Sequence, residues 1–389
     1  MALTIVSFPP IVNFMENPIL VSAASDLTKQ FLKVGIACDT VITDTAQSIS
    51  WARTFKFSIP VDVAGNPVKF DIASCAQTAM NVYKHEVITA AGNYSCPVIS
   101  IKFYLYEEYL ESGVSYPVDA PTFANTASAN KQEIYVLPGG LSDFERYRLS
   151  ASDTVSQFVE PMKFLTRKPD GEIVHPDEIH LVPFVLGTTA SFDMKLYNKG
   201  VSAAISSNSY TLNSYRSYTS ALSMNGKSGK TLFCQMEVGG VAKSKSPEFY
   251  VGERESERFH FQFINGFGLR ESISCYSRSS LQYAITTTQN TRVVERTFKS
   301  INNQFTTKTK PQATYGMSSG YVNEEWADWF LNEFLTTESA FMKINGIFVP
   351  VTIVPDSKVT VYDHSKNQLC HVDFDVKLAF SGSVNNRVR

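Results

Sequence analysis

The segment VDFDVKLAF at residues 372–380 places an apolar side chain at every second position. Because successive side chains of an extended strand point to opposite faces, this alternation predicts a strand with one buried face. The same period of two recurs at Phe55–Ile59 and, with three phenylalanines, at Phe259–Phe263. No regular alternation of strands with long helices accompanies these runs, which disfavours a doubly wound enzyme fold.

Clusters of Gly, Pro, Asn and Ser recur roughly every 8–12 residues, a spacing typical of β-sandwiches and barrels. The fold class that we predict is therefore mainly β, with two or three sandwich-like or barrel-like domains and one or two short helices. The patterns also predict three local features: a hairpin from Phe55–Ile59 to Val68–Ile72 over Gly65-Asn66, a central strand at Val98–Tyr106, and a hairpin turn at Asn345-Gly346.

One amphipathic helix is expected near the C-terminus. Asn323 is a suitable N-cap, and Glu324 and Glu325 suit the positive end of a helix dipole. The aromatic residues that follow share one helical face, and we expect them in the core: Trp326, Trp329, Phe330 and Phe334.

The chain of 389 residues is long enough for two or three domains. A stretch rich in Pro and Gly within residues 150–180 indicates a connector between the first two domains. The predicted division is 1–149 as an N-terminal β domain, 150–180 as the connector, 181–310 as a middle β domain, and 311–389 as a C-terminal β region that is either separate or one domain with 181–310.

Charge and cysteine content exclude several function classes. The chain has 35 Lys and Arg against 37 Asp and Glu, so no global basic field is available and no nucleic acid partner is expected. The six Cys are widely spaced without a CxxC pair, which excludes zinc ribbons and favours core thiols over disulfides. The N-terminus lacks the pattern of a secretory signal and no apolar run is long enough for a membrane span, so we expect synthesis in the cytoplasm.

Two motifs invite a chemical interpretation. The run GKSGKT at 226–231 resembles a phosphate-binding loop, but Met224 stands where the motif requires Gly and a strand-like run follows. The run HPDEIH at 175–180 spaces its two histidines at i and i+5 and contains Pro176, so a polar connector loop is favoured over a metal site. We therefore predict no catalytic, cofactor-binding or metal-binding residues and no enzyme activity.

Two segments are candidate interfaces. The run FINGFGLRES at 263–272 leaves a strand through two glycines, and it is either a simple connection or a loop that presents Phe267 and Leu269 to a partner. The charges of ERESER at 253–258 alternate, which indicates a solvated edge strand or a ladder of intersubunit ion pairs through Arg254 and Arg258.

Several short patterns resemble virion structural proteins of tailed phages that infect Bacteroidetes, of the tail or baseplate type. They are ENPI at 16–19, PGGLS at 138–142, FINGFG at 263–268 followed by RES, and the C-terminal order of a helix, FVPVTI at 348–353 and a final alternating strand. The resemblance implies a non-enzymatic subunit, present in several copies in the virion, with copies of itself and other virion proteins as partners.

The function that we predict from the sequence is accordingly a structural subunit of a phage tail or baseplate, assembled as a homo-oligomer. Its high content of aromatic residues suits stable interfaces. The alternative is a glycan- or receptor-binding module of a fibre or adhesin, with Tyr104, Tyr106, Tyr109 and Tyr116 as candidate contacts. A capsid-associated protein and a polysaccharide hydrolase with carboxylates far apart in sequence are less favoured.

Overall fold

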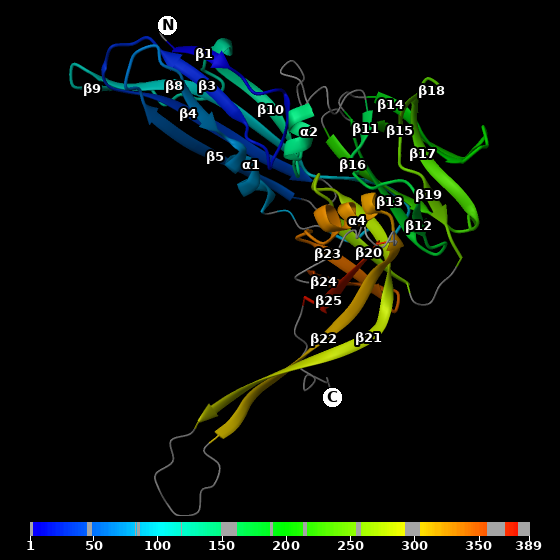
Figure 1. Ribbon diagram of the computed structural model, residues 1–389. Coiled ribbons are helices and arrows are strands. Elements are labelled where there is room, and N and C mark those ends of the chain that lie inside the picture. Colours follow the sequence, from blue (N-terminus) through cyan, green and yellow to red (C-terminus); the bar gives the residue numbers. More distant parts are fainter. Residues whose placement is uncertain are drawn as a thin grey trace, which may run out of the picture.

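The computed structural model is mainly β, as predicted, and has an N-terminal sandwich, a middle sandwich and a C-terminal barrel with a long projecting hairpin (Figure 1). It describes residues 3–44, 49–81, 83, 86–117, 119–148, 162–186, 190–212, 216–253, 258–291, 304–355 and 370–379, and for 278–291 and 304–313 the path and pairing of the backbone alone. In these ranges no helix is long and apolar enough to cross a bilayer.

The N-terminal sandwich packs a three-stranded sheet against a six-stranded sheet. The first has the order β1 (Leu3–Ser7), β3 (Leu20–Ser25), β6 (Val68–Asp71), and the second has the order β2 (Val12–Phe14), β10 (Lys131–Leu137), β8 (Val98–Glu111), β4 (Gln30–Asp44), β5 (Ile49–Pro60), with β9 (Val114–Tyr116) beside β8. Apolar residues of both sheets and of α1 (Ala73–Met80) share one buried core. Two short helical segments, η1 (Ser128–Asn130) and α2 (Asp143–Arg148), flank β10 in the sequence.

The predicted central strand is confirmed, because β8 lies between β4 and β10. The predicted hairpin over Gly65-Asn66 is wrong: β5 pairs with β4, whereas β6 pairs with β3 of the other sheet. The turn signal was real, but β6 belongs to the opposite layer of the sandwich, so the chain crosses between layers at this turn.

The middle sandwich also has two sheets. One has the order β11 (Met162–Phe164), β13 (Ile179–Leu186), β16 (Arg216–Ser223), β7 (Gly92–Ser95), and the other has the order β12 (Glu172–Val174), β19 (Phe249–Val251), β17 (Lys230–Val238), β14 (Ala190–Asn198), β15 (Ala204–Leu212), with β18 (Val241–Lys245) beside β17. The inward side chains of both sheets form a second core, including Phe184, Phe192 and Met236.

The sheets group the chain differently from the predicted boundaries. Strands β11 and β12, within the segment interpreted as a connector, are members of the middle sandwich, and β7 joins it from the segment 1–149. The boundary at 310 falls inside β22 (Gln304–Val322). Strands β11 and β12 have three residues each, too few for a period of two to stand out in a Pro-rich stretch, so the pattern alone does not separate them from a loop.

The C-terminal part is a closed barrel. Its strands follow the order β20 (Arg258–Ile264), β21 (Arg270–Thr291), β22, β25 (Cys370–Leu378), β24 (Ile347–Pro355), β23 (Ala340–Ile344), and back to β20. The buried face predicted from the alternation at 372–380 is confirmed in β25, since Val372, Phe374 and Val376 are fully buried. Position 380 and the strand expected at 358–362 lie outside the described residues.

The predicted helix is confirmed as α4 (Glu324–Trp329), which continues into the π-helical turn η2 (Phe330–Phe334). The side chain of Asn323 accepts a hydrogen bond from Trp326 N at 2.9 Å, as an N-cap does. Its four aromatic residues are buried in the barrel core. The predicted hairpin turn joins β23 to β24, with φ values of 51° at Asn345 and 82° at Gly346, the left-handed region that this residue pair favours.

Candidate functional site

The most distinctive surface feature is an arm formed by the outer parts of β21 and β22 (Figure 1). Within the barrel, β21 pairs with β20 as far as Tyr276, and β22 pairs with β25 from Thr314 onward. Beyond these points the two strands pair with each other from Leu281↔Tyr315 to Thr291↔Gln304, after an irregularity between Ser277 and Leu281. Eleven residues of β21 at about 3.4 Å each make this arm roughly 35 Å long.

The segment 281–313, which contains both strands of the arm, has a charge opposite to that of the rest of the chain. Residues 281–313 contain five Lys or Arg and one Glu, a net charge of +4. The whole chain has a net charge of −2, so the remaining residues carry −6. The near-neutral net charge of the whole chain was the reason to expect no nucleic acid partner. It hides an uneven distribution of charge between this segment and the rest of the chain.

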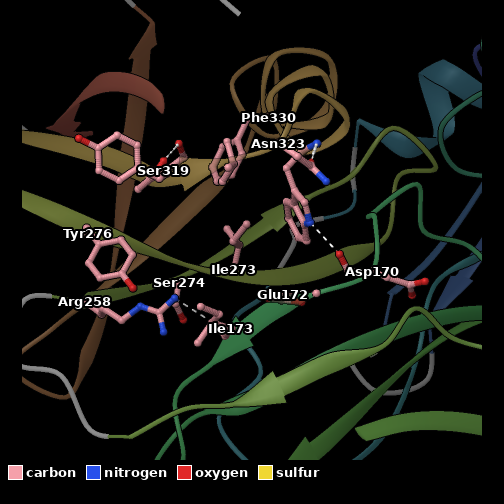
Figure 2. Close-up of a pocket in the computed structure, with 15 residues that line it drawn as sticks. Asp170, Glu172, Ile173, Arg258, Ile273, Ser274, Tyr276, Ser319, Asn323 and Phe330 are labelled. Atoms are coloured by element: carbon pink, nitrogen blue, oxygen red, sulfur yellow. Dashed lines mark hydrogen bonds between the residues drawn. The ribbon is translucent and has the colours of Figure 1, made fainter. Parts of the chain in front are cut away.

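A pocket of about 700 Å³ lies at the base of the arm, between the barrel and the middle sandwich (Figure 2). Its walls are partly aromatic and apolar, from Ile273, Tyr276 and Phe330, and partly polar, from Asp170 and Asn323. The ring of Tyr321, which is 79% exposed, also lines it. Such a mixture of rings and hydrogen-bonding groups is typical of ligand pockets.

Two side chains of the barrel form hydrogen bonds to the backbone of the middle sandwich at the walls of this pocket. Arg258 donates from Nη2 to the carbonyl oxygen of Ile173 at 3.1 Å, and its guanidinium lies 4.7 Å from the ring centroid of Tyr276 (Figure 2). Trp326 donates from Nε1 to the carbonyl oxygen of Asp170 at 2.8 Å. Arg258, predicted as an interface residue, thus contacts a second domain of its own chain, and Arg254 lies outside the described residues.

Behind the pocket, a buried ionic network joins the middle sandwich to the barrel. Lys168 lies 2.9 Å from a carboxylate oxygen of Glu172 and 3.6 Å from one of Glu271, and it donates to the carbonyl oxygen of Ser272 at 2.5 Å. A second pair is adjacent, with His260 Nδ1 3.2 Å from Glu178 Oε2. Several carboxylates and few cations are therefore enclosed together.

Burial dominates the electrostatics of this network. It raises the pKa of Glu172 and of Glu271, although Lys168 opposes the shift. Burial alone would also raise the pKa of Glu178, but His260 and the hydroxyl of Ser274 outweigh it, so this pKa is lowered. The pKa of His180 is held well below 6.5, first by burial and then by the charges of Lys168 and His260.

The predicted exposure of Phe267 and Leu269 is wrong, because both side chains are buried, at 3% and 0% exposure. They belong to a cluster that joins all three parts of the molecule, with Phe14 from the N-terminal sandwich and Val185 from the middle one. The loop packs between domains of its own chain, where it forms a joint. A single sequence cannot separate this role from binding to a partner chain, because both require apolar side chains.

Three of the segments that carry the phage resemblance meet at this joint. Gly140 N donates to Gly266 O and Glu16 N donates to Gly139 O, both at 2.9 Å, and the side chain of Asn17 pairs with the backbone of Leu141. A Cβ on Gly139 would lie 2.1 Å from the backbone of Phe267, and this close approach explains the glycines of both segments.

The two motifs tested for chemistry occupy structural positions. Strand β17 begins at Lys230, so the segment 226–231 leads into a strand, as predicted, and not into a helix. The expectation of a polar connector loop for 175–180 holds for 175–178, which connect β12 to β13. It is wrong for His180, which lies in β13, and both His175 and His180 are buried. The described residues contain no group of three or more His, Cys, Asp and Glu side chains arranged to hold a metal ion.

The tyrosines proposed for glycan contact do not form an exposed set. Tyr104 is buried, and Tyr109 stacks on Tyr116 with ring centroids 4.9 Å apart. Burial raises the pKa of Tyr106 to about 12. The signal in the sequence was the aromatic content of β8, which the strand uses for packing within its own sheet.

Comparison with known protein families and with curated proteins finds no match. Similar solved structures include CBD12 from CALX1.2 (8% identity, 61% of this chain and 80% of that chain, TM-score 0.20) and the calcium binding domain CBD12 of CALX1.1 (7% identity, 61% and 80%, TM-score 0.20). The BSP domain of a biofilm associated protein has 9% identity, covers 82% of this chain and 63% of that chain, and has a TM-score of 0.18. Scores this low carry no argument about fold or function.

Proposed function

We propose that this chain is a non-enzymatic structural subunit of a larger particle, for which its resemblance to phage proteins favours a virion tail or baseplate. The observation that carries the proposal is the arm of β21 and β22. A two-stranded hairpin without a core of its own is marginally stable in water. A ribbon of this length is therefore best explained by a partner surface that covers it in the assembled state.

The rest of the molecule supports the same conclusion. The three parts are joined by buried contacts at the cluster around Phe267 and by the ionic network at Lys168, as suits a subunit that is held between several neighbours. The net charge of −6 outside the segment 281–313 complements the +4 of that segment, so copies of the chain attract each other through unlike surfaces.

The test is to remove the arm without opening the barrel. Gln282 and Thr314 are paired, so the hairpin can be closed there with an Asn-Gly turn that replaces residues 283–313. We expect the variant to keep its circular dichroism spectrum and melting temperature but to lose assembly, measured by analytical ultracentrifugation and by electron microscopy of particles.

The matched control is Gly239→Asn, which places the same Asn-Gly turn at the hairpin between β17 and β18. It should assemble like the wild type. An arm-less variant that still enters particles, or absence of the chain from purified native particles, would overturn the proposal. If truncation abolished retention of nucleic acid and left assembly intact, the arm would belong to a nucleic-acid-binding function instead.

A second candidate, a glycan-binding module, is favoured by the pocket at the base of the arm. The exposed ring of Tyr321 offers a stacking surface, and Asp170 and Asn323 offer acceptors and donors for hydroxyl groups. Binding to a glycan array that is lost in Tyr321→Ala would support the glycan-binding function. The absence of binding to any glycan on the array would contradict it.

A further inference from the structure

Open strand edges are unequally protected in this molecule. Native sheets block exposed edges with charges, Pro, short strands or bulges, because an unpaired edge invites pairing with another chain. Among the described strands, two edges that are long enough for extended pairing carry such protection. Strand β5 contains Arg53, Lys56 and Pro60, and the arm portion of β22 contains Lys308, Lys310 and Pro311.

Two long edges lack charges and Pro, and the one register irregularity of β15 is confined to its start, opposite Leu196 and Tyr197. Strand β15 ends its sheet and has the sequence AISSNSYTL, nine residues without charge or Pro. The arm portion of β21, Leu281–Thr291, has the sequence LQYAITTTQNT, eleven residues without charge or Pro. Beyond Tyr276 it pairs on one side with β22, and no described strand pairs with its other side.

Strand β15 also borders a groove. Residues Ser206–Tyr210 line one side of a space of about 580 Å³, and Ala221–Ser223 of β16 and Gly92 of β7 line another. The groove thus lies where the open sides of the two sheets of the middle sandwich face each other. A strand added to β15 would gain backbone hydrogen bonds and would cover this groove, which is the geometry of strand addition to a sheet edge.

We propose that β21 of the arm of one copy adds as a further strand to β15 of a second copy. The two runs are similar in length and in chemistry, since five of the nine residues of β15 are Ser, Thr or Asn and five of the eleven arm residues are Thr or Asn, side chains whose cross-strand pairs stabilise sheets. The arm extends from the barrel on the side away from both sandwiches, so it does not reach β15 of its own chain (Figure 1). The contact joins unlike surfaces and therefore builds a ring or a filament.

This inference rests on the proposed function and specifies its contact. The test uses two blocked full-length chains. The first is the double variant Ser207→Lys, Asn208→Lys, at exposed positions of β15, and the second is the arm-less chain closed at Gln282 and Thr314. The charge-matched control is Val201→Lys, Ser202→Lys, at exposed positions of the preceding turn.

Each blocked chain should be monomeric alone at concentrations at which the wild type and the charge-matched control assemble. Mixed together, they should form a 1:1 dimer and nothing larger, because one retains a usable arm and the other a usable β15. A mixture that stays monomeric overturns the inference. If the β15 variant assembles like the wild type while the arm-less chain does not, the inference fails and the proposed structural function stands.

A synthetic peptide of residues 281–291 provides a second measurement that needs no folded variant. It should inhibit assembly of the wild type and should shift the NMR signals of β15, with no effect on the β15 double variant. A wild type that is monomeric at high concentration together with a peptide that leaves β15 unchanged overturns the inference.

Discussion

The guanidinium of Arg167 lies over the ring of Phe267, with its central carbon 4.0 Å from the ring centroid. The same group donates to Glu145 at 3.0 and 2.6 Å, to the carbonyl oxygen of Gly140 at 2.9 Å, and to Glu333. One side chain of the middle sandwich therefore bonds to the N-terminal sandwich and to the barrel.

We expect Arg167→Lys to destabilise the protein by about 2–4 kcal/mol, because an ammonium cannot reproduce the planar fork and leaves part of the joint without donors. Urea unfolding followed by circular dichroism measures the change. Arg53→Lys is the matched control, since Arg53 is exposed and its guanidinium lies 5.4 Å from the ring centroid of Phe55. A similar loss in both variants would show that the joint has no special role.

The amide of Gln262 makes a second long-range contact. Its Oε1 accepts from Ile88 N at 2.9 Å and its Nε2 donates to Ile88 O at 2.7 Å, with both residues buried. Gln262→Leu would leave a buried N–H and a buried C=O unpaired, so we expect a loss of about 2–5 kcal/mol in the free energy of unfolding. Gln77→Leu, on the exposed face of α1, should change it by less than about 0.5 kcal/mol. Equal effects would contradict this account.

The position of Gln262 shows how far sequence reasoning reaches. The alternation at 259–263 correctly predicts a strand with Phe261 and Phe263 in the core, because strand period depends on local sequence alone. It does not reveal that the polar face is also buried, with His260 and Gln262 exposed by 4% and 0%. The polar face is buried because Ile88 and Glu178 pack against it. Both residues are far away in the sequence, so their position depends on the tertiary fold.

The candidate site shows the same division. The strand character of β21 and β22 is readable from Thr-rich and β-branched composition, but their continuation beyond the barrel is not. The arm begins where β20 and β25 stop pairing with β21 and β22, and the sequence of the arm does not show where those two strands end. The charge contrast between 281–313 and the rest of the chain is present in the sequence and marks this segment as distinct, although it does not predict that the strands continue beyond the barrel.

The core of the barrel offers a direct test of the face assignment in β25. The ring of Phe374 is fully buried, with centroids 5.5 Å from Phe334 and 6.5 Å from Phe261. Phe374→Ala should cost about 3–5 kcal/mol through lost transfer energy and a cavity. Phe374→Asp should fail to fold, because an unpaired buried carboxylate costs more. Thr352→Ala, at an exposed site of β24, is the control for thermal melting, and a melting temperature of Phe374→Asp equal to that of the wild type would show that the assigned face is wrong.

The buried imidazole of His180 predicts how stability depends on pH. Its pKa lies well below 6.5, first because of burial and then because of Lys168 and His260. Below pH 6.5 the unfolded chain therefore binds a proton that the folded chain does not, so this group lowers stability as pH falls, with a slope of up to about 1.4 kcal/mol per pH unit. His180→Phe removes the titration and keeps a ring against Phe249, whose centroid is 4.2 Å away. We expect its urea midpoint to fall less than that of the wild type between pH 7 and pH 5.

The control separates proton linkage from packing. Phe249→Leu removes the ring contact of His180 and leaves the imidazole in place, so it should lower stability by a similar amount at both pH values and retain the wild-type slope. A slope between pH 7 and pH 5 that is unchanged in His180→Phe would contradict the assignment. Glu178 is a separate source of acid sensitivity at lower pH. Its lowered pKa contributes stability above pH 4.5 that is lost below it, and this loss should be absent in Glu178→Gln.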